Sequence, residues 1–253
     1  MSQIADRSFI GKGEIFIGPY AGGAPRVSVG NCSELTINHG TEKKKQLDYT
    51  TAGGGNANTL ERITEVTTNI KAHDVNAYNL ALGAFGTTST VATGAVTAEP
   101  HPTYKNGLVP FTYVPDISAA ITVKDAAAGT TTYVAGTDYV VTGAGIYILP
   151  GSTITDSVAG ADTIKVDYTK KAVDVVEAMV NTGLEYKLMF VGLNEAGSGK
   201  QAIVTIHRFK PGAAQNVAYI GDDYAALDLP GEALSDSLIT GAGLSKFYKV
   251  QLA

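Results

Sequence analysis

Apolar and polar positions alternate along residues 59–71, and this is the clearest pattern in the sequence. Successive side chains of a β-strand point to opposite faces, so the alternation predicts a strand with one buried and one solvated face. The positions expected on the buried face are Leu60, Thr64, Val66, Thr68 and Ile70. The positions expected on the solvated face are Glu61, Glu65, Thr67, Asn69 and Lys71.

Other segments rich in Thr, Val, Ile and Tyr are separated by Gly, Asn, Asp and Pro, which is typical of a mainly β protein. The further strands expected in the flanking parts of the chain are residues 13–17, 27–38, 42–50, 184–193, 201–210 and 245–252. Residues 74–85 have helical spacing instead, with Asp74 placed to cap the helix and Gly86 to end it. This order predicts a β-sandwich or barrel with one flanking α-helix.

The composition shifts to Thr, Ala and Gly over residues 88–171, which indicates an inserted domain. The strands expected within it are residues 120–125, 131–134, 139–142, 145–149 and 163–169. Short strands at a spacing of about 8 to 12 residues are typical of a small β-sandwich. We therefore expect a discontinuous core domain, residues 1–87 and 172–253, that carries the inserted sandwich.

The charge balance argues against a nucleic-acid-binding protein, and the length of the apolar stretches argues against a membrane-spanning one. The 253 residues include 19 basic and 24 acidic side chains, a net charge of −5, whereas binding to phosphates needs clustered Lys and Arg. The longest apolar stretches, such as residues 188–191, are far shorter than the roughly 18 to 20 residues that cross a bilayer. Tight nucleic-acid binding and a membrane span are therefore not expected. Cys32 is the single cysteine, and we interpret it as a small core side chain.

No combination of residues predicts a catalytic, cofactor or metal site, so we do not expect an enzyme. The four histidines are scattered, without a second ligand at a suitable spacing. Residues 197–200 read Gly-Ser-Gly-Lys, but Asn194 and Gln201 depart from the phosphate-loop pattern, so a hairpin turn is expected. The basic triplet 43–45 is expected to protect an edge strand, and the acidic pair 222–223 to form a solvated turn.

Outside the insertion, a series of features follows a distinctive order. They are the opening Gly11-Lys12-Gly13-Glu14-Ile15, the strand 29–37, the flexible loop 50–58, the strand 60–71, the helix with Asn76 and Asn79-Leu80-Ala81-Leu82, and the strand pair near 201–210. In this order and texture the chain resembles the bacteriophage major tail tube protein family, over residues 11–86 and 173–253.

The resemblance implies a structural virion protein that assembles as stacked hexameric rings into the phage tail tube, the conduit for DNA ejection. The partners it implies are further copies of the chain, the tape measure protein, and tail terminator or baseplate proteins. It places the protein in the virion tail after assembly in the host cytoplasm. DNA would pass in transit without specific binding, and a mildly acidic wall rich in Thr and Asn suits such a conduit because it repels phosphate.

Two groups of residues are candidates for contacts in such a tube. The loop residues expected to contact a neighbouring subunit are Thr51, Gly53, Gly54, Gly55, Asn56 and Asn58. Consecutive glycines are costly to order, so we expect this loop to be mobile in the monomer and ordered by its neighbour. The side chains Glu61, Glu65 and Thr67 are candidates for lining the channel, and an outward solvated face is the alternative interpretation.

The insertion resembles the immunoglobulin-like domains that decorate the outer surface of some tail tubes, through residues 136–141 and 164–169. Such a domain on every subunit would obstruct a contractile sheath, so a non-contractile tail is expected. The alternative function is a surface adhesin or carbohydrate-binding β-sandwich, in which tyrosines of the insertion contact sugar. The absence of Trp from the sequence weighs against this alternative.

Overall fold

The computed structural model describes residues 8–127, 129–196 and 199–253. The chain divides into two compact units. Unit 1 comprises residues 1–88 and 176–253, and unit 2 comprises residues 89–175.

The two junctions between the units lie in neighbouring strands. Strand β5 (Thr87–Val91) contains the first junction and β13 (Val173–Glu177) the second, and these two strands pair with each other. The chain therefore enters and leaves unit 2 through one two-stranded ribbon. From the sequence, the inserted domain is expected over residues 88–171, so its second junction is expected four residues before the one in the structure.

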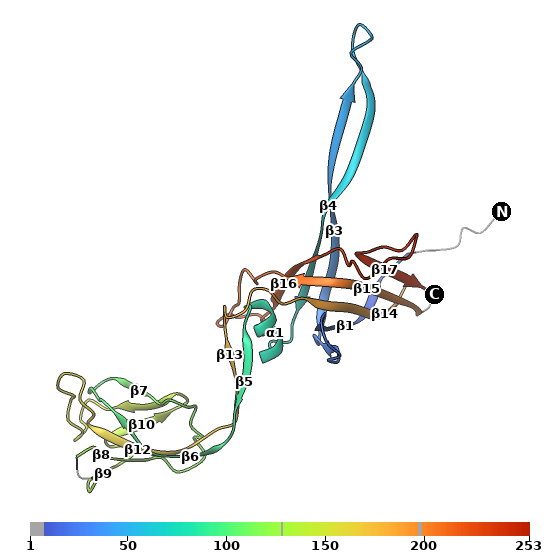
Figure 1. Cartoon of the computed structure of the whole chain (residues 1–253). Coiled ribbons are helices and arrows are strands. Elements are labelled where there is room, and N and C mark those ends of the chain that lie inside the picture. Colours follow the sequence, from blue (N-terminus) through green and yellow to red (C-terminus); the bar gives the residue numbers. More distant parts are fainter. Residues whose placement is uncertain (1–7, 128, 197–198) are drawn as a thin grey trace. The chain divides into compact units, whose positions relative to one another are not determined.

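Unit 1 is mainly β, with antiparallel strands and a single helix among its described residues (Figure 1). Its elements are β1 (Gly11–Pro19), β2 (Val27–Ser28), β3 (Cys32–Leu47), β4 (Asn56–Ala72), α1 (Ala77–Gly83), β14 (Tyr186–Asn194), β15 (Lys200–Pro211), β16 (Leu227–Ala233) and β17 (Tyr248–Leu252). One sheet runs in the order β2-β1-β14-β15-β16-β4-β3, and β17 also pairs with β15. β16 and β17 pair with different halves of β15.

The sheet of unit 1 surrounds an apolar core but does not close into a barrel. Strands β1, β4, β14 and β15 and helix α1 contribute to the core, for example through Ile17, Ile70, Leu82, Leu188 and Ile206. Closure would require β1 or the short edge strand β2 to pair with β3, whereas β3 pairs with β4 alone within the described residues. The expectation of a barrel is therefore wrong, and the sheet is open between β1 and β3.

Helix α1 is shorter than expected and begins at a different cap. Asn76 is the N-cap residue in place of Asp74, and its side chain accepts a hydrogen bond from the Asn79 amide at 2.9 Å. The Asp74 carboxylate accepts from the amide of Asn31 at 3.2 Å instead. Asn79 is buried, and its Nδ2 donates to the carbonyls of Val29 and Asp74. These bonds attach the start of the helix to the segment that precedes β3.

Two strands of unit 1 differ from the expectation, because tertiary pairing outweighs local turn signals. The segments 27–38 and 42–50, expected as separate strands, lie largely in the single 16-residue strand β3, which passes through Gly40. Strand β16 has no strand signal in the sequence, because Pro230 and Gly231 interrupt it. It nevertheless pairs with both β4 and β15 and joins the two halves of the sheet.

Unit 2 is a small β-sandwich of two antiparallel sheets. Its strands are β6 (Gly94–His101), β7 (Leu108–Pro110), β8 (Thr122–Asp125), β9 (Thr132–Tyr133), β10 (Tyr139–Thr142), β11 (Gly145–Ile148) and β12 (Ile164–Lys170). The sheets have the orders β6-β12-β8-β9 and β10-β11-β7. Both contribute to one core, with Val123, Ile164 and Tyr168 from the first sheet and Ile146 and Ile148 from the second.

The strand order of unit 2 differs from that of an immunoglobulin domain. Constant-type immunoglobulin domains hold the first, second, fourth and fifth strands in one sheet and the third, sixth and seventh in the other. In unit 2 the first strand, β6, pairs with the seventh, β12, and the second strand, β7, pairs with the sixth, β11. The immunoglobulin-like expectation rested on sequence texture, and it is wrong for the strand order.

A buried carboxylate fixes the turn before β10 in unit 2. Asp138 accepts hydrogen bonds from the amide of Val134 at 2.9 Å and from the amide and hydroxyl of Thr153, both at 2.8 Å. These donors favour the ionised form, so they hold the pKa of Asp138 below its usual value. The carboxylate thereby attaches the turn to the loop that follows β11.

Candidate assembly surface

Strands β3 and β4 extend beyond the rest of the unit 1 sheet as a long hairpin (Figure 1). We define the hairpin arm as residues 41–65. All of its paired residues are exposed on both faces, whereas β4 becomes alternately buried from Val66 onward. Leu47, Leu60 and Ile63 of the arm are between 47% and 59% exposed. The expected buried face of β4 is therefore wrong for its first part, because no described residue of unit 1 covers the arm.

A β-bulge lies at the base of the hairpin arm. Gly40 pairs with Glu65, and the next residue, Thr41, pairs with Ile63, so Thr64 is the extra residue of the bulge. A β carbon on Gly40 would lie 2.5 Å from Cγ of Glu65 and 2.9 Å from Oγ1 of Thr64. Both side chains are thus on one face, and the alternation along β4 reverses at this point.

The bulge separates the residues expected to line a channel. Because the alternation shifts by one residue, Glu61 takes the face of Val66, whereas Glu65 and Thr67 take the opposite face. Glu61 and Glu65 are exposed, and Thr67 is half-buried where β4 lies between β3 and β16. The expectation that these three side chains share one face is wrong, and the extra residue in β4 is the physical reason.

The tip of the hairpin arm is organised around Asp48. Its carboxylate accepts hydrogen bonds from the amide of Thr50 at 2.7 Å and from the hydroxyls of Thr50 and Thr51 at 2.6 and 2.7 Å. These bonds lower the pKa of Asp48 to about 2. Gly53 and Gly54 have positive φ angles of 102° and 66°, a conformation that other residues adopt with strain. The predicted contact residues Thr51, Gly53, Gly54, Gly55, Asn56 and Asn58 are all exposed at or beside this tip.

The basic triplet lies along the outer strand of the hairpin arm. Strand β3 ends the sheet, which confirms the expected edge position of the lysines. Nζ of Lys43 is 3.6 Å from Glu61, and Nζ of Lys44 is 3.7 Å from Glu42. Lys45 has no ion pair in the described part of the chain. Exposed pairs of this kind contribute little to stability, so the charge of the triplet remains available to a partner.

The open seam of the sheet contains a cavity of about 670 Å³. Strands β1 and β3 both line it, and its apolar side chains include Ile15, Leu35, Ile37 and Phe190. Residues 11–14 of β1 pair with β14 only, as far as the described chain extends, whereas the carbonyl of Ile15 accepts a hydrogen bond from the amide of Val29. The seam therefore combines an apolar surface with two unpaired strand edges, which is the kind of surface that an added strand completes.

A second exposed surface lies between β15 and β16. We call residues 215–226 the acidic loop. Its side chains Tyr219, Ile220 and Tyr224 are 81%, 97% and 99% exposed, and Asp222 and Asp223 lie among them. Within the described chain, residues 215–226 form no hydrogen bond or ion pair. The sequence interpretation recognised the acidic pair as a turn but missed the large apolar residues on either side of it.

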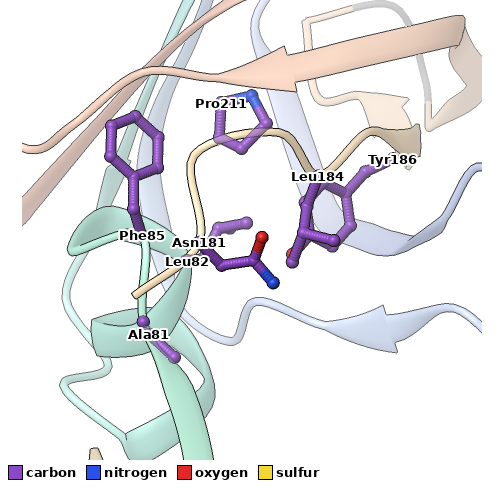
Figure 2. A pocket seen from close by; sticks show the side chains of 8 residues that line it. Ala81, Leu82, Phe85, Asn181, Leu184, Tyr186 and Pro211 are labelled. Atoms are coloured by element: carbon purple, nitrogen blue, oxygen red, sulfur yellow. The ribbon is translucent and has the colours of Figure 1, made fainter. Parts of the chain in front are cut away.

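Figure 2 shows a small pocket beside helix α1, where Leu82, Phe85, Asn181 and Tyr186 are among the lining residues. Its volume of about 10 Å³ is the space that a single water needs, so it offers no room for a substrate. In residues 8–127, 129–196 and 199–253, no group of three or more His, Cys, Asp or Glu side chains is placed to hold a metal ion. No helix among them is long and apolar enough to cross a membrane.

The remaining candidates from the sequence occupy structural positions. Cys32 packs against the unit 1 core, and burial, together with the charge of Asp74, raises the pKa of its thiol to about 11. The thiol is therefore protonated at neutral pH, as suits a core side chain. Residues 197 and 198 of the Gly-Ser-Gly-Lys segment lie outside the described residues. Their neighbours Asn194 and Lys200 pair with each other, so the segment joins two antiparallel strands.

A comparison with protein families gives a match over almost the whole chain. Residues 8–251 match the family described as "Protein of unknown function UCP028589". The chain belongs to this family. A search of curated proteins finds no match. Family membership supports treating both units as parts of one protein type, because residues 8–251 include both unit 1 and unit 2.

Proposed function

We propose that the chain is a structural subunit of a bacteriophage tail tube, in which hexameric rings stack to form the conduit for DNA ejection. The hairpin arm is the observation that carries this proposal. It exposes Leu47, Leu60 and Ile63 on a strand pair that the described residues of unit 1 leave uncovered. Burying a side chain of this kind is worth roughly 1.5–3 kcal/mol, so a neighbouring subunit on the arm would gain substantial stability.

The open seam supports the formation of rings. A closed ring needs each subunit to present one surface that complements a different surface of the next subunit. The seam between β1 and β3 offers unpaired backbone groups beside apolar side chains, so a strand of the adjacent copy would extend the sheet there. In this proposal the sheets of six copies continue from one subunit into the next.

The charge of the chain supports a passive conduit. DNA must pass through a tube without being held, and the net charge of −5 does not favour phosphate binding. The bulge restricts the proposal for the channel wall, because Glu61 and Glu65 lie on opposite faces of β4. One of these carboxylates at most faces DNA if the arm contributes to the wall.

The proposal extends to partners and to the tail type. A tube of this kind would enclose a tape measure protein and end on terminator or baseplate proteins. Unit 2 is a separately packed sandwich of 87 residues, residues 89–175, with its own core. We place it on the outer surface of the tube because a narrow channel would not accommodate it, and this favours a non-contractile tail.

Sedimentation equilibrium of the purified chain tests the proposal directly. A single chain has a mass of 26.2 kDa, so a ring of six would have a mass of about 157 kDa. We expect this species, or longer stacks of it, to increase with protein concentration. A mass of 26.2 kDa at every concentration, without growth after addition of a tail initiation complex, would contradict the proposal.

A further inference from the structure

We infer that the hairpin arm of one copy docks on the acidic loop of another, so that copies join head to tail. This inference rests on the proposed self-assembly and adds the partner surface for the arm. Three properties support this contact: exposed apolar side chains on both surfaces, the opposite charges of the basic triplet and the acidic pair, and the distance between them along strand β4.

The acidic loop exposes large apolar side chains, as the hairpin arm does. Tyr219, Ile220 and Tyr224 are among the most exposed large side chains of the chain, and the loop that carries them forms no hydrogen bond within the described residues. The loop is nevertheless attached at its start. The amide of Ala214 donates to the carbonyl of Gly83 at 2.8 Å, and Val217 packs against the core. A fixed base with an apolar outer part is suited to contact with a partner.

The basic triplet of the arm and the acidic pair of the loop have opposite charges. The arm carries Lys43, Lys44 and Lys45 in succession beside its exposed apolar residues. The acidic loop carries Asp222 and Asp223, which have no ion pair in the part of the chain that the structure describes. Opposite charges on two apolar surfaces guide association and fix which surfaces meet. The arm as a whole is neutral, with four basic and four acidic side chains, so the attraction rests on the basic triplet, in which Lys45 has no ion pair within the described residues. Like charges on two copies of the acidic loop disfavour contact of this loop with itself.

The basic triplet and the acidic loop lie far apart along strand β4. The acidic loop leads directly into Leu227, which pairs with Ala72 at one end of β4. The tip of the arm lies beyond Asn56, at the other end of the same 17-residue strand. At about 3.3 Å per residue this strand is roughly 55 Å long. Lys43 pairs with Glu61, which is eleven residues and roughly 36 Å along the strand from Ala72. The five residues from Asp222 to Leu227 cannot span this distance, so the basic triplet and the acidic pair meet only between copies, in a head-to-tail contact that can repeat without limit.

Charge reversal in the full chain tests the assignment. The arm variant is Lys43→Glu, Lys44→Glu and Lys45→Glu, and the loop variant is Asp222→Lys and Asp223→Lys. Each alone places like charges on both surfaces, so we expect loss of all assemblies longer than one ring in sedimentation velocity. Combining the five substitutions in one chain restores opposite charges and should restore assembly. Mixing the arm variant with the loop variant should also restore it, because each supplies the complement of the other.

A matched control separates the contact from a general effect of net charge. Lys105→Glu, Lys165→Glu and Lys171→Glu change the net charge as much as the arm variant does, but all three residues lie in unit 2. We expect this control to assemble like the wild type. Ile220→Asp tests the apolar part of the loop. Its side chain is 97% exposed, so the thermal unfolding midpoint should not change while assembly is lost.

The results distinguish the inference from the function on which it rests. If the wild type assembles and the arm variant assembles equally well, the acidic loop is not the partner, and the proposed function stands. The same conclusion follows if the arm variant fails but neither the five-fold combination nor the mixture restores assembly. If the wild type itself remains a monomer under all conditions, both the proposed function and the inference are wrong.

Discussion

Gly40 lies directly opposite Glu65, and the side chains of Glu65 and Thr64 occupy the space that a β carbon on Gly40 would need. The bulge at this position marks where β4 changes from a half-buried strand of the sheet to an exposed strand of the hairpin arm. Bulges increase the local right-handed twist of a strand pair. The bulge opposite this glycine therefore changes the twist of the strand pair where the arm leaves the rest of the unit 1 sheet.

Replacing Gly40 should disturb the arm more than the core. In Gly40→Val the new side chain collides with Glu65 and Thr64, and overpacking of this kind costs roughly 1 kcal/mol or more. We expect faster amide hydrogen exchange in residues 41–47 and 59–65, with little change in residues 66–72. Thr41→Val is the control. It introduces the same side chain at the next position, which pairs with Ile63, and keeps Gly40 opposite Glu65. Unaltered exchange in the arm of Gly40→Val would show that the bulge does not depend on glycine.

The tip of the arm should be dispensable for folding and necessary for assembly. Leu47 pairs with Asn56, so an Asn-Gly turn in place of residues 48–55 closes the hairpin without changing its register. We expect an unchanged thermal unfolding midpoint and loss of tubes in electron micrographs. Asp48→Asn keeps an acceptor for the Thr50 amide and serves as the milder control. Tubes of normal length from the shortened arm would exclude the tip as a contact.

Asp138 should make the stability of unit 2 depend on pH. Its folded-state pKa lies below the unfolded value of about 3.9, so its stabilising effect is complete above that value and is lost as the pH falls through the folded-state pKa. Asp138→Ala leaves the amides of Val134 and Thr153 without their acceptor, at a cost of about 1–3 kcal/mol.

Hydrogen exchange of unit 2 amides in the full chain measures this effect. We expect the difference in protection between wild type and Asp138→Ala to be large at pH 7 and to shrink as the pH falls through the lowered folded-state pKa of Asp138. Thr142→Ala is a control in the same unit, because it removes one hydroxyl that donates to the carbonyl of Gly145 and no charge. A difference that stays constant with pH would rule out the carboxylate as its source.

Removal of unit 2 should leave a folded and assembling unit 1. Both junctions lie in the paired strands β5 and β13, so a short Gly/Ser linker between Thr88 and Val176 spans a small gap. We expect the shortened chain to keep the far-UV circular dichroism of a β protein and to form tubes. An unfolded product would show that unit 1 needs unit 2, and a folded product without tubes would place assembly contacts in unit 2.

The alternation of apolar and polar residues predicts the mainly β class and the strand β4, but it cannot predict where β4 stops being covered. Both parts of β4 have similar alternation in the sequence and pair with β3, but only the second part also pairs with β16 and has a buried face. The sequence of β4 does not predict the bulge either, because a residue is extra only in relation to the strand with which β4 pairs. A two-residue period therefore assigns Glu61 and Glu65 to one face of β4, whereas the bulge between them places them on opposite faces.

Local turn signals explain the other differences. Pro230 and Gly231 indicate a turn, yet they lie within β16, which pairs with β4 and β15. In the acidic loop, Asp222 and Asp223 suggest a solvated turn, and the exposure of Tyr219 and Ile220 depends on what the rest of the chain leaves uncovered. The strand order of unit 2 depends on contacts between distant segments, which short motifs do not encode.

Negative-stain electron microscopy of the purified chain at increasing concentration tests the central proposal most directly. We predict rings of six subunits with a central hole, and stacks of these rings that grow into tubes as the concentration rises. The shortened-arm protein, imaged on the same grids, should give no tubes. Particles of single-chain size at every concentration, even after seeding with a tail initiation complex, would contradict the proposed function.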